Sequence, residues 1–440
     1  MSADVVSVHI RGIAVGGEAV GEVTEVHSGS GSDSDLLGIT TFVPFANPGE
    51  IVLAQVTEKK DKYLRASLLE VVRSSPERVT PRCPYFTDCG GCELQQLSLE
   101  GQLSAKFQMI QGALRAGRLP ANVVDMLSPV VPGLDYGFRR RIQLHISSSG
   151  SLGFYRAGTR SVVSINSCPV AVPEINTLIP SAKDILPKAK GLINSLTFES
   201  DGKKVIAILT SPYALSPKDI KEIESVARGV FKDFIIVCEG KEVLTHGQSY
   251  LDMPLNKAGT LHVSIPGGAF SQVNWPVNLL LIEKILEFAG TGAGKSVFDL
   301  FSGAGNFSLP LARAGFSVTA VETDKRLIVY GRDSARKSGL EERIQYVESS
   351  VEKYLKKHPE ILNGEYVIAD PPRSGLGASL VDFLSNPEKI FLVSCHLPSF
   401  VRDLKALSEK GFGVELIQPF DMFSQTSYVE ILAVLEKNQT

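Results

Sequence analysis

Four cysteines are spaced like a set of metal ligands. Cys83, Cys89 and Cys92 form the pattern C-x5-C-x2-C in a segment rich in proline and glycine, and Cys168 follows much later in the chain. Four thiolates can hold a [4Fe-4S] cluster or a zinc ion, and three cysteines so close together seldom all serve as core packing. The spacing alone does not choose between the two metals.

Three more polar side chains fall at the ends or in the middle of apolar runs near the C terminus. Asp370 ends the run 366–369 and opens the motif D-P-P-R-S-G, Cys395 ends the run 390–394, and Glu430 interrupts an apolar strand. Ligands of open α/β sheets bind at the carboxyl ends of strands, so Cys395 stands where a nucleophile belongs. A packed core thiol is the alternative for Cys395 taken alone. A buried Glu430 would be costly without a role or a partner.

The segment 299–308 predicts a nucleoside site. Its sequence D-L-F-S-G-A-G-N-F-S follows an apolar strand and precedes a helix, and Gly303 and Gly305 allow a sharp turn and a close approach to a ligand. The next strand, 317–321, ends in Glu322 about 20 residues later, where a carboxylate can bind ribose hydroxyls. The segment lacks both the G-x-G-x-x-G spacing and a phosphate-loop lysine. A nucleoside ligand therefore fits better than a dinucleotide.

Three domains are expected from the 440 residues. Short strands separated by turns predict a small OB-like barrel over 1–73, with a Ser/Gly-rich loop tip at 27–35. We expect a middle α+β domain over 74–261 and an α/β domain over 262–440. Apolar periodicity predicts a helix at 98–117, which is a candidate for packing on the C-terminal domain.

Composition narrows the function classes. The net charge is −3, so any nucleic-acid surface must be local. The start of the chain lacks a signal peptide, no apolar run reaches the length of a membrane span, and we expect a cytoplasmic monomer. Arginines interleaved with aromatic residues are candidates for RNA contacts, although strand arginines with carboxylate partners explain them equally well. These candidates are Arg139, Arg140, Arg141 and Arg156.

Taken in order, these pieces resemble the RNA uracil-C5 methyltransferase family, and most of all its iron–sulfur branch that carries a TRAM barrel and acts on 23S rRNA. The barrel signature at 42–50, the cysteine cluster and the motif F-x-Q-V-N at 270–274 precede the glycine segment, D-P-P-R-S-G, S-C and a terminal V-E. The match covers nearly the whole chain, and the order of the motifs carries it. It implies a Rossmann-like class I methyltransferase domain at the C terminus.

The resemblance also implies site residues. Cys395 would be the nucleophile and Glu430 the base. A [4Fe-4S] cluster, with zinc as the alternative, would be held by Cys83, Cys89, Cys92 and Cys168. S-adenosylmethionine would be contacted by Gln272, Phe301, Asn306, Glu322 and Asp370, and Ser350 stands where the family commonly has an Asp or Asn on the adenine side.

The implied chemistry explains why these groups are needed. Uracil C5 is a poor nucleophile, and addition of a thiolate to C6 gives C5 carbanion character. The pKa of Cys395 must be lowered for this step. Glu430 would then remove the C5 proton. The target base must leave its stack, and 23S rRNA is the first expected substrate and tRNA the next.

Two rival functions follow from the same residues. An enzyme that methylates an exocyclic amine needs no cysteine, and Arg373 after the two prolines argues against it. A non-catalytic RNA-binding or assembly protein is kept open by two departures from the family pattern, His396 after the cysteine and Tyr428 two residues before the glutamate.

Overall fold

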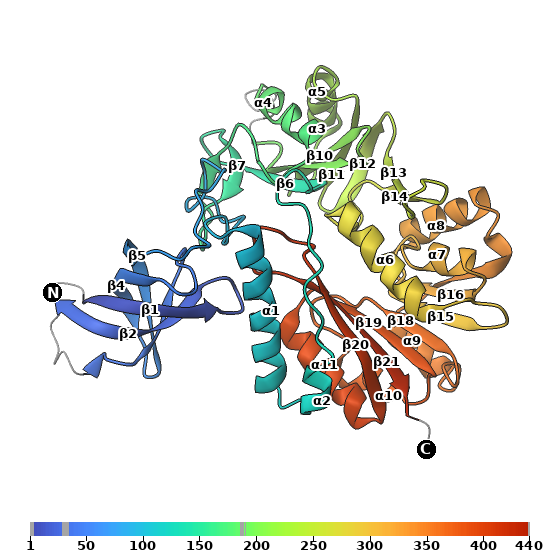
Figure 1. Cartoon of the computed structure of the whole chain (residues 1–440). Helices are drawn as coiled ribbons and strands as arrows, with labels where there is room; N and C mark the ends of the chain where they lie inside the picture. The colour runs from blue at the N-terminus through green and yellow to red at the C-terminus, as the bar shows by residue number, and fades with distance from the viewer. Residues whose placement is uncertain (1–3, 29–34, 185–188, 190, 439–440) are drawn as a thin grey trace.

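The computed structural model describes residues 4–28, 35–184, 189 and 191–438. Figure 1 shows three parts: an N-terminal barrel, a middle domain built on one sheet, and a C-terminal domain built on another. Within the described residues, no helix is long and apolar enough to cross a lipid bilayer. Residues 29–34 of the predicted loop tip lie outside the described residues.

The N-terminal barrel is closed, with strand order β1-β2-β3-β5-β4. Alternate residues of β1 face the core, where Val6, Val8 and Ile10 are fully buried. The predicted barrel is confirmed, but its fifth strand was missed because most of the C-terminal half of β5 is exposed and carries no clear alternation. The strands are β1 (Val5–Ile13), β2 (Ala19–Ser28), β3 (Thr40–Val43), β4 (Ile51–Lys59) and β5 (Tyr63–Arg73).

The middle domain has a seven-stranded sheet in the order β12-β11-β10-β9-β6-β7-β8. Strands β10 and β11 pair in parallel and the other neighbours are antiparallel. Its strands are β6 (Arg141–Ile146), β7 (Leu152–Tyr155), β8 (Val162–Ser164), β9 (Ser195–Ser200), β10 (Val205–Ser211), β11 (Asp233–Cys238) and β12 (Lys241–His246). Its helices are α3 (Pro173–Asn176), α4 (Leu178–Ala182) and α5 (Pro217–Arg228).

The predicted arginine strand is shorter than expected. Strand β6 begins only at Arg141, because the preceding residues follow a turn at Gly137, whose φ is +65°. Arg139 makes isolated backbone bridges to Ala171 and Asn274 instead of joining the sheet.

A two-stranded hairpin, β13 (Tyr250–Pro254) and β14 (His262–Pro266), leads into the C-terminal domain. Strand β14 packs against α8 of that domain, and the side chain of Ser334 in α8 accepts the backbone N–H of Ser264 at 2.9 Å. The expected boundary between 261 and 262 therefore falls inside this hairpin.

The C-terminal sheet has the order β17-β16-β15-β18-β19-β21-β20, and β21 runs antiparallel to the other six strands. This is the predicted Rossmann-like class I methyltransferase fold. The strands are β15 (Ser296–Leu300), β16 (Ser317–Glu322), β17 (Ile344–Glu348), β18 (Tyr366–Ala369), β19 (Lys389–Ser394), β20 (Phe412–Phe420) and β21 (Glu430–Lys437). The helices are α6 (Trp275–Ala289), α7 (Ser308–Arg313), α8 (Lys325–Lys337), the 3-10 turn η2 (Glu341–Arg343), α9 (Val351–Lys357), α10 (Gly377–Phe383) and α11 (Leu397–Glu409).

Helix α1 (Leu99–Ala116) lies between the barrel and the C-terminal domain, followed by the short α2 (Ala121–Val124) (Figure 1). The side chain of Ser98 accepts the N–H of Gly101 and so caps α1 at its N terminus. One face of α1 buries Ile110 and Leu114 in the core of the C-terminal domain, and the helix also contacts β1 of the barrel. Helix α1 therefore joins the first and last parts of the chain.

Candidate active site

The C-terminal sheet brings Asp370, Cys395 and Glu430 to one edge. Asp370 and Cys395 directly follow the parallel strands β18 and β19, and Glu430 begins β21. Because β21 runs antiparallel to β19, with Ile431 opposite Ser394, its first residue lies at the same edge as the carboxyl ends of the parallel strands. Segments far apart in the sequence thus place a thiol and two carboxyl groups together.

The electrostatics of this edge favour neutral groups. Burial raises the pKa of Cys395 to about 11, with the negative charges of Glu430 and Asp370 acting in the same direction and Arg373 opposing them. Burial also raises the pKa of Asp370 to about 7 and that of Glu430 well above its usual range. The expectation of a lowered pKa for Cys395 is therefore wrong for this arrangement, because burial, the largest cause, disfavours the thiolate and the two carboxyl groups add to that effect.

Glu430 is nearly fully buried, with 2% of its surface exposed. Its Oε1 atom has no hydrogen-bond partner among the described residues. An unpaired buried carboxyl oxygen is costly, and such groups are concentrated at functional sites. Oε1 of Glu430 is thus free to bond a ligand, in a site that favours the neutral form of the carboxyl group.

The loop after β15 forms a second, smaller cavity. Phe301, Gly303 and Gly305 all have positive φ, at +76°, +57° and +105°, and this lets the backbone turn back toward β16. The N–H of Gly303 donates to Glu322 Oε2 at 3.0 Å. A side chain at Gly305 would stand 2.5 Å from the hydroxyl of Tyr346, so only glycine fits there.

The predicted cofactor residues are divided by the structure. Gln272, Phe301, Asn306 and Asp370 line this second cavity. Glu322 is not part of the lining but holds the loop through Gly303. Ser350 does not line the cavity, because its hydroxyl caps α9 by accepting the N–H of Lys353 at 3.3 Å.

Two polar residues were missed from the sequence, one that lines this cavity and one that holds a lining residue. Asn278 of α6 is fully buried and forms a reciprocal amide pair with Asn306, at 2.8 and 3.0 Å. Ser302 lines the cavity, and its hydroxyl has no partner among the described residues. Asn278 could have been found from the sequence, because it is a polar residue within a mostly apolar helix. No pattern distinguished Ser302 from the rest of its loop.

A larger cavity of about 590 Å³ opens beside this smaller cavity. Its walls include Cys395, Arg373 and Tyr428, and Phe270 lines both cavities. The guanidinium of Arg373 lies 5.1 Å from the ring centre of Tyr428, within cation–π range. Tyr428, one of the departures from the family pattern, therefore faces the same space as Cys395, whereas His396 caps the start of α11 and bonds Ser399 instead.

The four predicted metal ligands also line this larger cavity. Burial raises the pKa of Cys89 to about 11 and of Cys92 to about 12, and Cys168 adds to both shifts. Thiolates at these positions need a positive partner, so the donor set suits a thiophilic metal. As the described side chains stand, no group of three or more His, Cys, Asp or Glu residues is arranged to hold a metal ion.

Three of the four candidate RNA-binding arginines have carboxylate partners. Arg140 lies 3.9 Å from Glu174, Arg141 lies 3.0 Å from Glu199, and Arg156 pairs with Asp88. Arg139 is the member of the set that lines the larger cavity, and its Nε donates to the carbonyl of Arg141 at 3.1 Å.

Comparison with known proteins agrees with this geometry. Residues 139–438 match the family described as tRNA (uracil-5-)-methyltransferase, and residues 3–69 match the TRAM domain. The chain belongs to the tRNA (uracil-5-)-methyltransferase family. As a member, it is an S-adenosylmethionine-dependent enzyme that methylates C5 of uracil in RNA, and the resemblance seen in the sequence is confirmed.

Relatives in this family extend over almost the whole chain. Two proteins named 23S rRNA (uracil(1939)-C(5))-methyltransferase RlmD are similar, from Shewanella amazonensis and Shewanella sediminis. The first is 32% identical over 93% of this chain and 93% of its own length, and the second is 30% identical over 94% and 95%.

A solved structure shares the fold. The tRNA (uracil-54, C5)-methyltransferase of Pyrococcus abyssi, solved with S-adenosyl-L-homocysteine, covers 97% of this chain and 99% of its own with a TM-score of 0.73 at 23% identity.

Proposed function

We propose that this protein methylates C5 of a specific uridine in 23S rRNA through a covalent bond between Cys395 and C6 of the base. The observation that carries the proposal is that Cys395, which lines the 590 Å³ cavity, meets a buried Glu430 with an unpaired Oε1 at one edge of the C-terminal sheet. The names of the two relatives with 30–32% identity support 23S rRNA as the substrate. We further propose that the enzyme acts as a monomer in the cytoplasm.

In this mechanism, Cys395 and Glu430 divide the work. In its thiolate form, the Sγ of Cys395 adds to C6 of the flipped uracil, the C5–C6 double bond opens, and its electron pair makes C5 nucleophilic. S-adenosylmethionine, when bound, supplies an electrophilic methyl group to C5. Glu430 then takes the proton from C5, the bond between Sγ and C6 breaks, and the aromatic base is restored. Arg373 and Tyr428 line the space that the base would occupy.

The residues around the smaller cavity would hold the cofactor. We propose contacts from Gln272, Phe301, Asn306 and Asp370, which line it, and from Glu322 beside it. The loop geometry supports this, since glycine backbone at positive φ leaves room for a ligand. Ser350 is bonded within its own helix cap and is a weaker candidate.

We also propose that Cys83, Cys89, Cys92 and Cys168 hold a [4Fe-4S] cluster. Their shared position on one cavity wall and the absence of nitrogen or oxygen ligands among the four support a thiolate-bound group. The proposed steps need no electron transfer, so a cluster there would hold the local fold beside the RNA. Anaerobic purification followed by iron, sulfide and zinc analysis tests this. We expect iron and sulfide, whereas about one zinc per chain and no sulfide would show that the four cysteines hold a zinc ion.

The function is tested by comparing the rRNA of cells with and without the gene. We expect loss of 5-methyluridine from one 23S rRNA fragment, read by mass spectrometry. Loss from a tRNA fragment would instead identify tRNA, the second candidate, as the substrate. The family description names tRNA.

A matched pair of variants tests the chemistry. Cys395→Ala is expected to abolish methylation. Glu430→Gln is expected to retain cysteine addition and to accumulate a covalent protein–RNA complex, seen on denaturing gels. A covalent complex in the Cys395→Ala protein would contradict the mechanism.

A further inference from the structure

The connection between β20 and β21 is an unusual loop, because nearly all of it is buried although it is polar. We call residues 421–429 the base loop, since Glu430 follows it directly. Buried polar groups need hydrogen-bond partners. Some partners in the base loop lie within the loop, and the others come from parts of the chain that precede the C-terminal domain. Its buried polar members are Asp421, Ser424, Gln425, Thr426 and Ser427.

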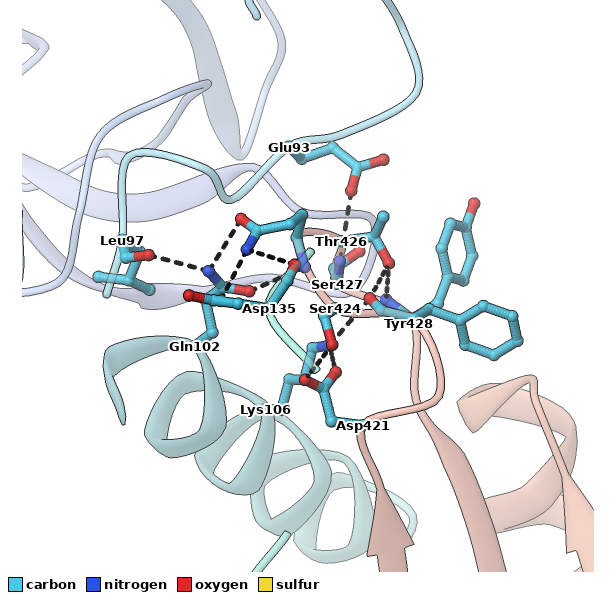
Figure 2. A network of polar contacts seen from close by, with 12 residues as sticks. Glu93, Leu97, Gln102, Lys106, Asp135, Asp421, Ser424, Thr426, Ser427 and Tyr428 are labelled. Carbon is cyan, nitrogen blue, oxygen red and sulfur yellow. Dashed lines mark hydrogen bonds and ion pairs between the residues drawn. The ribbon is translucent and has the colours of Figure 1, made fainter. Parts of the chain in front are cut away.

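The first partner is Lys106 of α1. Its ammonium group pairs with Asp421, and the two side chains are only 1% and 0% exposed. Lys106 also donates to the carbonyl of Phe423 at 3.2 Å, and Ser424 donates to the second carboxylate oxygen of Asp421 at 2.7 Å. Figure 2 shows this ion pair between the helix and the start of the base loop.

The second contact is centred on Gln425, which has φ +70°. The side chain of Gln102 accepts the N–H of Gln425 at 2.9 Å, and the backbone N–H groups of Glu93 and Leu94 donate to its carbonyl at 3.1 and 3.0 Å. Gln425 Nε2 donates to Asp135 at 2.9 Å. A non-glycine residue in the left-handed region persists only where its surroundings fix it, and here three separate segments do so.

The third contact comes from the barrel. Gly17, in the turn between β1 and β2, has no room for a side chain, because a Cβ would stand 2.9 Å from Cβ of Glu93 and 3.2 Å from Oγ of Ser427. Glu93 in turn accepts the N–H of Ser427 at 3.3 Å (Figure 2). The barrel turn, the segment after the cysteines and the base loop therefore meet at one point.

We propose that Gly17, Gln102 and Lys106 are positioning residues that hold the base loop and thereby fix Glu430 for proton removal. None of the three lines either cavity. Docking of the barrel against the base loop is then a requirement for the last chemical step, in addition to any part the barrel takes in RNA binding. This inference rests on the proposed role of Glu430.

Two neighbouring glycines give a matched test. Gly16 and Gly17 both have positive φ, at +104° and +90°, so alanine strains the backbone at either position. Only at Gly17 does the added carbon also collide with Glu93 and Ser427, whereas nothing lies within 4 Å at Gly16. We expect Gly17→Ala to lower kcat on an unmodified 23S rRNA transcript at least tenfold, with KM changed less than threefold. Gly16→Ala should stay within threefold of the unmodified enzyme in both.

The covalent protein–RNA complex is the readout that separates positioning from general destabilisation. If Glu430 is displaced, cysteine addition proceeds but proton removal slows, and the complex accumulates in Gly17→Ala and Gln102→Ala. Leu114→Ala removes a buried side chain about three turns after Gln102 in α1, and it should lower the melting temperature without accumulating the complex.

Glu430→Gln is run beside these variants. If Glu430→Gln traps the complex but Gly17→Ala and Gln102→Ala do not, the positioning role is wrong and the proposed function stands. If Glu430→Gln traps nothing, the proposed role of Glu430 fails. Equal loss of kcat in Gly16→Ala and Gly17→Ala would also overturn the inference.

Discussion

The proposed nucleophile, Cys395, is a thiol that its own surroundings keep protonated. The pKa of Cys395 is raised from 9.0 to about 11, so the thiolate fraction at pH 7 is roughly a hundredfold below that of an unperturbed thiol. Activation of Cys395 therefore depends on positive charge or proton acceptance that arrives with the ligands. The cationic cofactor and the residue Arg373 act in the required direction.

Alkylation of Cys395 by iodoacetamide measures this directly. We expect slow modification at pH 7, a rate that increases about tenfold per pH unit up to pH 10, and a pKa near 11 by peptide mass spectrometry. Arg373→Ala should slow alkylation, because Arg373 lowers the pKa of Cys395. A rate that is flat from pH 7 to 9 would contradict the raised pKa.

At the scale of elements, the loop after β15, which we propose binds the cofactor, depends on helix α6. No sequence pattern connects this helix with the loop. Asn278 of α6 holds Asn306 through two amide hydrogen bonds. Losing a buried partner costs about 1–3 kcal/mol, because the remaining amide stays unsatisfied.

We therefore expect Asn278→Ala to weaken S-adenosyl-L-homocysteine binding by about tenfold, measured by isothermal titration calorimetry. Asn278→Asp keeps one acceptor for Asn306 and should lose less. An affinity within twofold of the unmodified protein in Asn278→Ala would show that the pair does not shape the loop.

The same example shows what could be read from the sequence. The glycine segment, Asp370 and Cys395 were placed correctly because strand ends and turns are local patterns. The partners of Asn306, Gln425 and Arg141 were not predicted, since each is contributed by a different element and no local pattern encodes such pairing. Strand β5 was missed for a related reason, because barrel closure buries only part of it.

At the scale of the whole molecule, Asp370 makes the free energy of unfolding depend on pH. The pKa of Asp370 is raised from 3.8 to about 7, so its contribution to folding is fully present below pH 3.8 and is lost as the pH rises through 7. A bound cation reverses this loss, because it favours the ionised carboxylate.

S-adenosylmethionine carries a positive sulfonium, and S-adenosyl-L-homocysteine does not. We expect the melting temperature of the protein without ligand to fall from pH 6 to pH 8. Saturating S-adenosylmethionine should raise the melting temperature more than S-adenosyl-L-homocysteine does. This margin, the difference between the melting temperatures with the two ligands, should increase by roughly 2 °C from pH 6 to pH 8. In Asp370→Asn the margin should be independent of pH. A margin equally constant in the unmodified protein would show that Asp370 is already ionised without ligand.

The two residues of the buried pair Lys106 and Asp421 are made at different times during translation. The two residues are 315 positions apart, and ribosomes add about 5–20 residues per second, so Lys106 waits roughly 15–60 seconds for its partner to be made. During that time the apolar face of α1 has no C-terminal core to cover it, although the barrel it follows can already close. The apolar face of α1 therefore stays exposed on the nascent chain until the C-terminal domain has been made.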